Sequence, residues 1–200
     1  MAMAGVVETM VREYFEQLGF LVRQERKYVT PSRREAEDGD FLVVHPQPVQ
    51  GEEALPFVLG TAEVLRLARA VVGVRGWHVE VLSPARLRSV PEVLRFVEPS
   101  AWKRALHALG PGPTPHRLLV ISGLPRDESE RQETVEVLRR RGVDGVLPLR
   151  TILAELVGAV EPNRNYLRSD LFQTLRLLKR YGFLALPQME LFPRQGRSRS

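Results

Sequence analysis

The 200-residue sequence contains no cysteine. This absence excludes disulfides, thiol nucleophiles and thiolate metal sites together. No apolar run approaches the roughly 20 residues that a membrane-spanning helix requires, and no signal-peptide pattern opens the chain. We therefore expect a cytoplasmic protein that does not associate with a membrane.

Several catalytic signatures are also missing. The segments GPGPTP and SGLPRD lack the spacing of a dinucleotide-binding loop and the lysine of a phosphate-binding loop, respectively. No GxSxG sequence is present, so serine hydrolase chemistry has no support. The histidines, His45, His78, His107 and His116, show no spacing typical of zinc ligands.

Lysine is scarce, whereas arginine is abundant. The only lysines are Lys27, Lys103 and Lys179 among 29 basic residues, which face 24 acidic residues for a formal net charge of +5. Residues 1–60 are net acidic, whereas residues 61–200 carry 23 basic and 14 acidic residues. Concentrated positive charge is typical of proteins that bind polyanions such as nucleic acid. Heavy use of arginine can also reflect a GC-rich genome, so charge alone leaves both explanations open.

Hydrophobic spacing and turn residues predict alternating helices and strands. Val7 to Leu18 has helical spacing and is followed by Gly19, a residue that commonly ends helices. The segment from Gln47 to Gly60 is rich in proline and glycine and is expected to be an insertion with a short hairpin. Further strands are expected at Phe20–Val29, Asp40–His45, Ala70–Glu80, Arg117–Ser122 and Val143–Leu149, and further helices at Ser100–Leu109, Asp127–Gly142 and Thr151–Val160. A last long helix is expected to end at Tyr181, and either Asn165 or Ser169 is expected to cap its start.

This order predicts an α/β fold with a mixed sheet flanked by helices. The short links between the first three strands suit an antiparallel meander, and the later strand–helix–strand unit suits a right-handed parallel crossover. We expect residues 1–160 to form the α/β core and residues 161–192 a C-terminal helical extension. Residues 193–200, which end in RQGRSRS, are expected to be a disordered basic tail.

Asp40 opens the second expected strand, and the third strand contains GVRGWH at residues 73–78. With the order of elements over residues 5–150, this resembles the restriction-endonuclease-like, or PD-(D/E)xK, nuclease superfamily. The resemblance implies Mg²⁺-dependent hydrolysis of phosphodiester bonds. It also implies an aspartate on the second strand, an acid-x-lysine motif on the third strand and often a glutamate on the first helix.

The chemistry explains this spacing. Residues two apart on a strand share a face, so an acid and a lysine can both approach one phosphate. Paired carboxylates supply the oxygen ligands that Mg²⁺ prefers, and the metal stabilises charge and helps to form hydroxide. On this chain the resemblance places Asp40 at the first acidic position and Glu8 at the helix glutamate, both as weak metal ligands.

The third strand departs from the family pattern. Gly73 stands where the metal-binding acid is expected, and Arg75 stands where the lysine is expected. Arginine can hold a phosphate but stays charged, so it is a poor proton shuttle. Asp40 and Arg75 are therefore interpreted as remnants of a catalytic site. The alternative, by which activity would be kept, is a migrated metal ligand supplied by Glu63, Glu80 or His78.

Arg75, Trp77 and His78 are the residues that we expect to contact nucleic acid. Four candidates also have a structural interpretation: Asp40 as a turn residue, Glu8 on the solvated side of its helix, Arg75 as a surface charge on a half-exposed strand, and Trp77 in the core. Arg139, Arg140 and Arg141 end a helix, where cations are favourable without any ligand.

Three functions follow, from different classes. The first is a nucleic-acid-binding protein, with DNA as the expected partner, whose nuclease site is impaired. The second is an active endonuclease with a rearranged site that uses Mg²⁺ or Mn²⁺. The third is a non-catalytic scaffold in which the helix at Asn165–Tyr181 docks on another subunit. Homodimers are common among proteins that act on duplexes, so a homodimer is expected for the first two.

Overall fold

The computed structural model of the chain describes residues 2–24, 39–74 and 81–184. The chain divides into two units, Met1–Leu156 and Val157–Ser200. The described strands are β1 (Leu21–Gln24), β2 (Gly39–Val44), β3 (Arg69–Val74), β4 (His116–Ile121) and β5 (Gly145–Pro148). The described helices are α1 (Ala2–Gln17), α2 (Thr61–Val64), α3 (Pro84–Ser89), the 3₁₀-helix η1 (Pro91–Val97), α4 (Pro99–Leu109), α5 (Glu128–Arg140), α6 (Leu149–Ala159) and α7 (Asp170–Arg180).

The first unit contains one mixed sheet with the strand order β1-β2-β3-β4-β5. β1, β2 and β3 pair in antiparallel fashion, as the short links between them predict. β3, β4 and β5 pair in parallel, and the intervening helices make these connections. The predicted α/β class and the mixed sheet flanked by helices are therefore confirmed.

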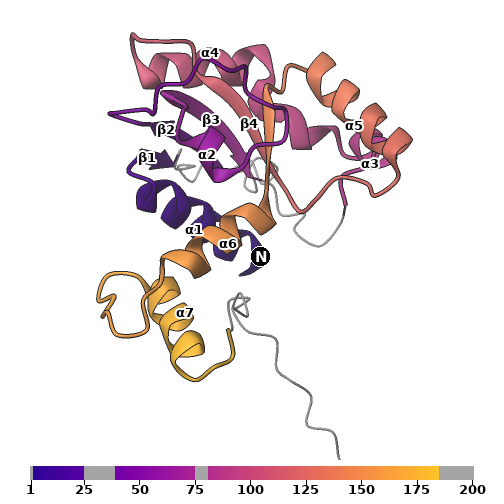
Figure 1. The fold of residues 1–200 in the computed structure, drawn as a ribbon. Helices are drawn as coiled ribbons and strands as arrows, with labels where there is room; N and C mark the ends of the chain where they lie inside the picture. The colour runs from indigo at the N-terminus through magenta and orange to yellow at the C-terminus, as the bar shows by residue number, and fades with distance from the viewer. Residues whose placement is uncertain (1, 25–38, 75–80, 185–200) are drawn as a thin grey trace, which may run out of the picture. The chain divides into compact units, whose positions relative to one another are not determined.

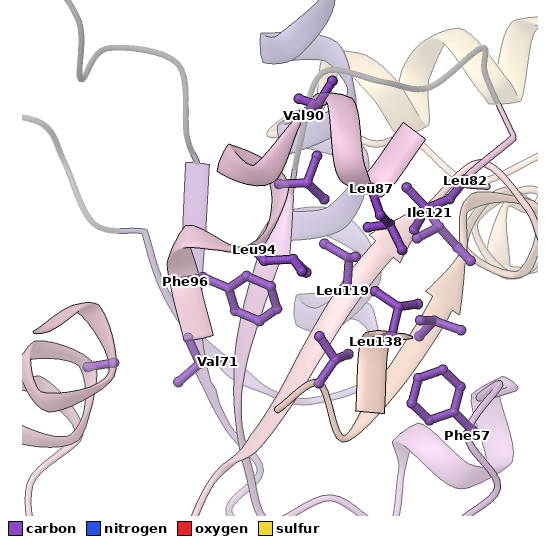
Figure 2. Packing of buried hydrophobic residues seen from close by; sticks show 14 of the residues in the cluster. Phe57, Val71, Leu82, Leu87, Val90, Leu94, Phe96, Leu119, Ile121 and Leu138 are labelled. Atoms are coloured by element: carbon purple, nitrogen blue, oxygen red, sulfur yellow. The ribbon is translucent and has the colours of Figure 1, made fainter. Parts of the chain in front are cut away.

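One face of the sheet is covered by α3, η1, α4 and α5. Alternation along the strands directs Leu42, Val71 and Leu119 to this face, where all three are buried. Figure 2 shows Phe96 of η1, Leu87 and Leu138 packed around the same strands. We call this side of the sheet the η1 face.

The opposite side of the sheet, here called the α1 face, carries α1 (Figure 1). Phe41 and Val43 alternate with the residues of the η1 face and are fully buried, as are Val11 and Phe15 of α1. Gly19 ends the first helical segment with φ of +87°, a backbone conformation that glycine adopts without strain. Both faces of the central strands are thus buried, which explains the continuous apolar run of β3.

The segment 47–60 differs from its predicted form. It contains no strand pair of its own; Val58 instead forms an isolated parallel bridge with Val146 of β5. The Leu59 amide donates to the Val146 carbonyl at 2.9 Å, and the Val146 amide donates to the Phe57 carbonyl at 2.8 Å. The prediction of a hairpin was therefore wrong, because this segment satisfies the free edge of β5 rather than pairing with itself.

The second unit contains α7, which begins after Ser169. The Ser169 hydroxyl accepts a hydrogen bond from the Phe172 amide at 3.2 Å, so the predicted serine cap is confirmed. The Tyr166 and Phe172 rings stack with their centroids 5.3 Å apart. The Lys179 ammonium donates to the Val160 carbonyl at 2.7 Å, which ties the end of α7 to the start of this unit.

Among the described residues, no helix has both the length and the apolar composition that crossing a membrane requires. The expected disordered segment at residues 193–200 lies outside the described residues.

Candidate functional site

Asp40 and Gly73 lie opposite each other in the antiparallel pair of β2 and β3. Residues directly opposed in such a pair share a face, and their side-chain positions are about 5 Å apart. Asp40 is half-buried at the end of β2. The structure therefore brings together the two positions at which the sequence resemblance implies a pair of metal-binding acids.

At Gly73, where the resemblance implies a second acid, the space for a side chain is filled by another residue. A Cβ atom built on Gly73 would lie 2.7 Å from Cδ1 and 2.9 Å from Cε1 of the Phe96 ring. Phe96 is 1% exposed and packs in the core of the η1 face (Figure 2). An acidic side chain at position 73 would therefore meet a buried aromatic ring instead of a metal ion in solvent.

No pattern in the sequence linked Phe96 to this site. It lies 23 residues after Gly73 along the chain, in η1, an element that the sequence pattern did not predict. The contact depends on how η1 crosses the sheet, and local periodicity does not encode that crossing. Only the tertiary structure shows that the glycine provides room for the phenyl ring.

Glu8 lies on the other side of the sheet from Asp40. The Gln24 amide nitrogen donates to the Glu8 carboxylate at 2.8 Å, and Gln24 is opposite Phe41 in the β1–β2 register. Phe41 follows Asp40 directly and therefore points to the α1 face. Arg12 completes this cluster by donating to the Gln24 side-chain oxygen at 2.7 Å. The structure thus does not bring Glu8 and Asp40 to one site.

Glu63 has a local structural role. Its carboxylate accepts a hydrogen bond from the Gly60 amide at 2.8 Å, at the start of α2. The charge of Glu63 also acts on the Tyr14 hydroxyl of α1, so Glu63 lies on the α1 side of the sheet. Asp40 shares a face with Gly73, which packs against Phe96 on the η1 face. The structure therefore does not bring Glu63 and Asp40 to one site.

Tyr14 is buried near Glu63 and has a perturbed hydroxyl. Burial raises the pKa of Tyr14 to about 12; a hydrogen bond with Thr61 opposes this rise, whereas the charges of Glu155 and Glu63 add to it. The Tyr14 hydroxyl and the Thr61 hydroxyl are 3.3 Å apart. Because the neutral phenol is favoured in these surroundings, Tyr14 acts as a structural hydrogen-bonding group of the α1 face.

The remaining predicted site residues, Arg75, Trp77, His78 and Glu80, lie outside the described residues. Within the described ranges, no group of three or more histidine, aspartate or glutamate side chains could hold a metal ion. His45, for example, is engaged in the fold: its Nε2 is 3.1 Å from the Leu18 carbonyl, and its Nδ1 accepts from the Gln47 amide at 3.1 Å.

The described part of the site therefore consists of one carboxylate, Asp40, beside a strand position that is closed by Phe96. One carboxylate gives Mg²⁺ a single anionic ligand, which predicts weak binding of the metal. Comparisons of this chain with protein-family models, with curated proteins and with solved structures found no match.

Proposed function

We propose that this chain is a nucleic-acid-binding protein with a restriction-endonuclease-like core and an impaired nuclease site. The observation that carries the proposal is the pairing of Asp40 with Gly73, together with the burial of Phe96 against that glycine. The aspartate stands at the position that the superfamily uses for metal binding. The neighbouring position has lost its acid, and a phenyl ring occupies the corresponding space.

The order and pairing of the elements support the core that we propose. A helix, an antiparallel meander of three strands and a parallel strand–helix–strand unit follow one another, as the resemblance to the superfamily implies. The excess of positive charge in residues 61–200 supports a polyanionic ligand, and we propose DNA. Arg75, Trp77 and His78, which follow β3 in the sequence, remain the proposed contacts.

The test uses end-labelled duplex and single-stranded DNA with the full chain, in Mg²⁺, Mn²⁺ or EDTA. We expect a mobility shift without cleavage in all three conditions. The variant Asp40→Asn should leave the mobility shift unchanged, because in this proposal Asp40 no longer takes part in catalysis and is not a DNA contact. Glu52→Gln, which alters an exposed carboxylate in the 47–60 segment, is the matched control.

Two results would contradict this proposal. Cleavage that requires both a metal and Asp40, and that persists in Glu52→Gln, would show an active nuclease with a rearranged site. Glu80 would then be the first carboxylate to substitute. A chain that neither shifts nor cuts any DNA would exclude both nucleic-acid functions, and the scaffold function would be tested next by measuring the mass of the assembly.

A further inference from the structure

Helix α4 has two chemically different sides. Ala105 is 4% exposed in the core of the η1 face, and Trp102, Ala108 and Leu109 pack against the same cluster. The other side carries Lys103, Arg104 and His107, and all three are exposed. These residues are three or four positions apart, or adjacent, so their side chains form one outward-facing group. We call them the α4 basic face.

The positive charge of the α4 basic face is not neutralised locally. The sequence of α4, Pro99–Leu109, contains no aspartate or glutamate, and the nearest acid along the chain is Glu98 at its N-cap. Within residues 2–24, 39–74 and 81–184, neither Lys103 nor Arg104 forms a salt bridge. Two permanent cations are therefore presented to solvent side by side.

Helix α5, on the same face of the sheet, shows the opposite arrangement. Arg140 pairs with Glu136 at 2.7 Å, and Arg131 lies 3.4 Å from Glu128. Arg88 of α3 lies 3.4 Å from Glu133 of α5. Three of the arginines at α3 and α5 are thus paired with glutamates, whereas Arg139 lies over the Phe57 ring. Helix α4 differs from α5 because its own sequence contains no acid that could pair with Lys103 and Arg104.

Two further cations contact α4 or its C-cap. The Arg117 guanidinium lies 4.2 Å from the centre of the Trp102 ring. The Arg69 guanidinium donates to the carbonyl of Gly110, the residue that follows α4, at 2.8 Å. Fixed positive charges close to one another add to the surface potential and attract polyanions.

The α4 basic face lies on the same side of the sheet as Asp40. Phe96 of η1 contacts Gly73, the strand partner of Asp40, and α4 begins two residues after η1 ends. Figure 1 shows α4 on the side of the sheet opposite α1. A long polyanion could therefore extend from the end of β3 across α4.

We infer that Lys103, Arg104 and His107 bind the phosphate backbone of duplex DNA. This inference rests on the proposed nucleic-acid function and identifies a second contact surface, separate from the third strand. The charge of the surface complements phosphate, and the absence of acids removes competing intramolecular partners. Backbone contacts of this kind position a protein on DNA without reading its sequence.

Other acidic partners fit this surface less well. Helices that lie in a membrane interface insert an apolar side, whereas the apolar side of α4 is buried against the sheet. Protein interfaces generally contain exposed aromatic or large apolar anchors. Among the outward residues of α4, the exposed large apolar side chain is Leu106, at 38%. Phosphate recognition by cations requires no such anchor.

The experiment measures binding of the full chain to a fluorescent duplex DNA by anisotropy over a series of salt concentrations. Lys103→Ala/Arg104→Ala removes two cations from the α4 basic face. Arg88→Ala/Arg140→Ala removes two cations that already pair with glutamates, so each variant changes the formal net charge from +5 to +3. The control therefore has the same net charge but leaves the α4 basic face intact.

We expect the α4 variant to reduce the slope of log K against log salt by about 1.8, because each phosphate contact contributes about 0.9. The same relation gives a loss of affinity on the order of 30-fold at 0.15 M salt. The control variant should retain most of the wild-type slope. Thermal unfolding of both variants checks the fold, and Lys103→Gln/Arg104→Gln replaces the alanine pair if that pair does not fold.

Each of four outcomes would contradict either the proposed function or the inference about α4. If the wild type does not bind duplex DNA, the proposed function fails. If it binds and the α4 variant keeps the full slope, only the inference about α4 fails. Equal reductions in both variants would show an effect of net charge without a local surface. Binding to phosphatidylserine vesicles that requires Lys103 and Arg104, without binding to DNA, would show that the ligand is a lipid headgroup.

Discussion

The contact between Gly73 and Phe96 allows the proposed impairment of the site to be tested by stability measurements. A Cβ atom at position 73 would lie 2.7, 2.9 and 3.0 Å from three atoms of the Phe96 ring. Because the ring is 1% exposed, it has little room to withdraw. We therefore expect Gly73→Ala to destabilise the fold through overpacking.

The size of the effect follows from two opposing contributions. Overpacking a well-packed core costs about 1–3 kcal/mol. Replacing glycine by alanine in a strand recovers about 0.5–1 kcal/mol, because glycine loses more conformational freedom on folding. The net loss in the free energy of unfolding is therefore about 1 kcal/mol, within a range of about 0–2.5 kcal/mol. For a chain of this size, a loss of about 1 kcal/mol corresponds to a decrease in Tm of about 2–4 °C.

Unfolding by urea and by heat, followed by circular dichroism, measures this loss. Gly123→Ala is the matched control, because a Cβ at Gly123 would have no atom within 4 Å. In the background Phe96→Leu, which makes the neighbouring side chain smaller, Gly73→Ala should cost less than in the wild type. Additive effects, with a coupling below about 0.5 kcal/mol, would refute the argument that Phe96 closes position 73.

Gly73→Asp extends the same reasoning to function. If the glycine and Phe96 together impair the site, aspartate at position 73 alone should not restore metal-dependent cleavage, because the ring occupies the space that the carboxylate needs. Gly73→Asp/Phe96→Ala removes that obstacle. Since Phe96→Ala itself costs about 3–5 kcal/mol as a loss of buried aromatic packing, Mg²⁺ binding is measured only after folding has been checked.

Two further predictions concern buried polar groups, Tyr14 of α1 and Arg69 of β3. An unfolded tyrosine titrates near pH 10, whereas burial raises the pKa of Tyr14 to about 12 in the folded chain. The unfolded state therefore loses its proton first, and the free energy of unfolding should fall as the pH rises from about 10 to about 12, by at most ~3 kcal/mol. Tyr14→Phe should remove this part of the pH dependence, and an unchanged profile would contradict it. Arg69 is 6% exposed, and its guanidinium donates to the carbonyls of Gly110 at 2.8 Å and Pro113 at 3.2 Å. Arg69→Met should lower the free energy of unfolding by about 1–3 kcal/mol, because two acceptors lose their donors. Hydrogen exchange should also become faster near residues 110–116, and unchanged exchange there would mean that Arg69 does not hold this loop.

Much of the fold follows from local patterns in the sequence. Alternating and continuous apolar runs predicted β2 and β4, and Asp127 and Ser169 predicted the starts of α5 and α7. These elements are encoded by hydrophobic periodicity and capping within a few residues. The lengths of the connections were sufficient to predict the antiparallel meander and the later parallel strands.

Elements without a local pattern could not be predicted in this way. The sequence of η1, PEVLRFV, has neither a clear helical period nor strand alternation, so its position depends on packing against the η1 face. The segment 57–59 joins the edge of β5 because free backbone groups there need partners. Such pairings are long-range, and composition alone does not specify them.

The same distinction between local sequence patterns and long-range packing applies to the candidate site. The sequence by itself determined that Asp40 opens a strand, that the third strand carries glycine where the resemblance implies an acid, and that positive charge is concentrated after residue 60. Only the tertiary structure decided that Asp40 faces Gly73, that Phe96 fills the space beside that glycine and that the sheet separates Glu8 from Asp40. The physical reason is that strand register and helix crossing are set by packing between distant segments, whereas residue type and periodicity are properties of the local chain.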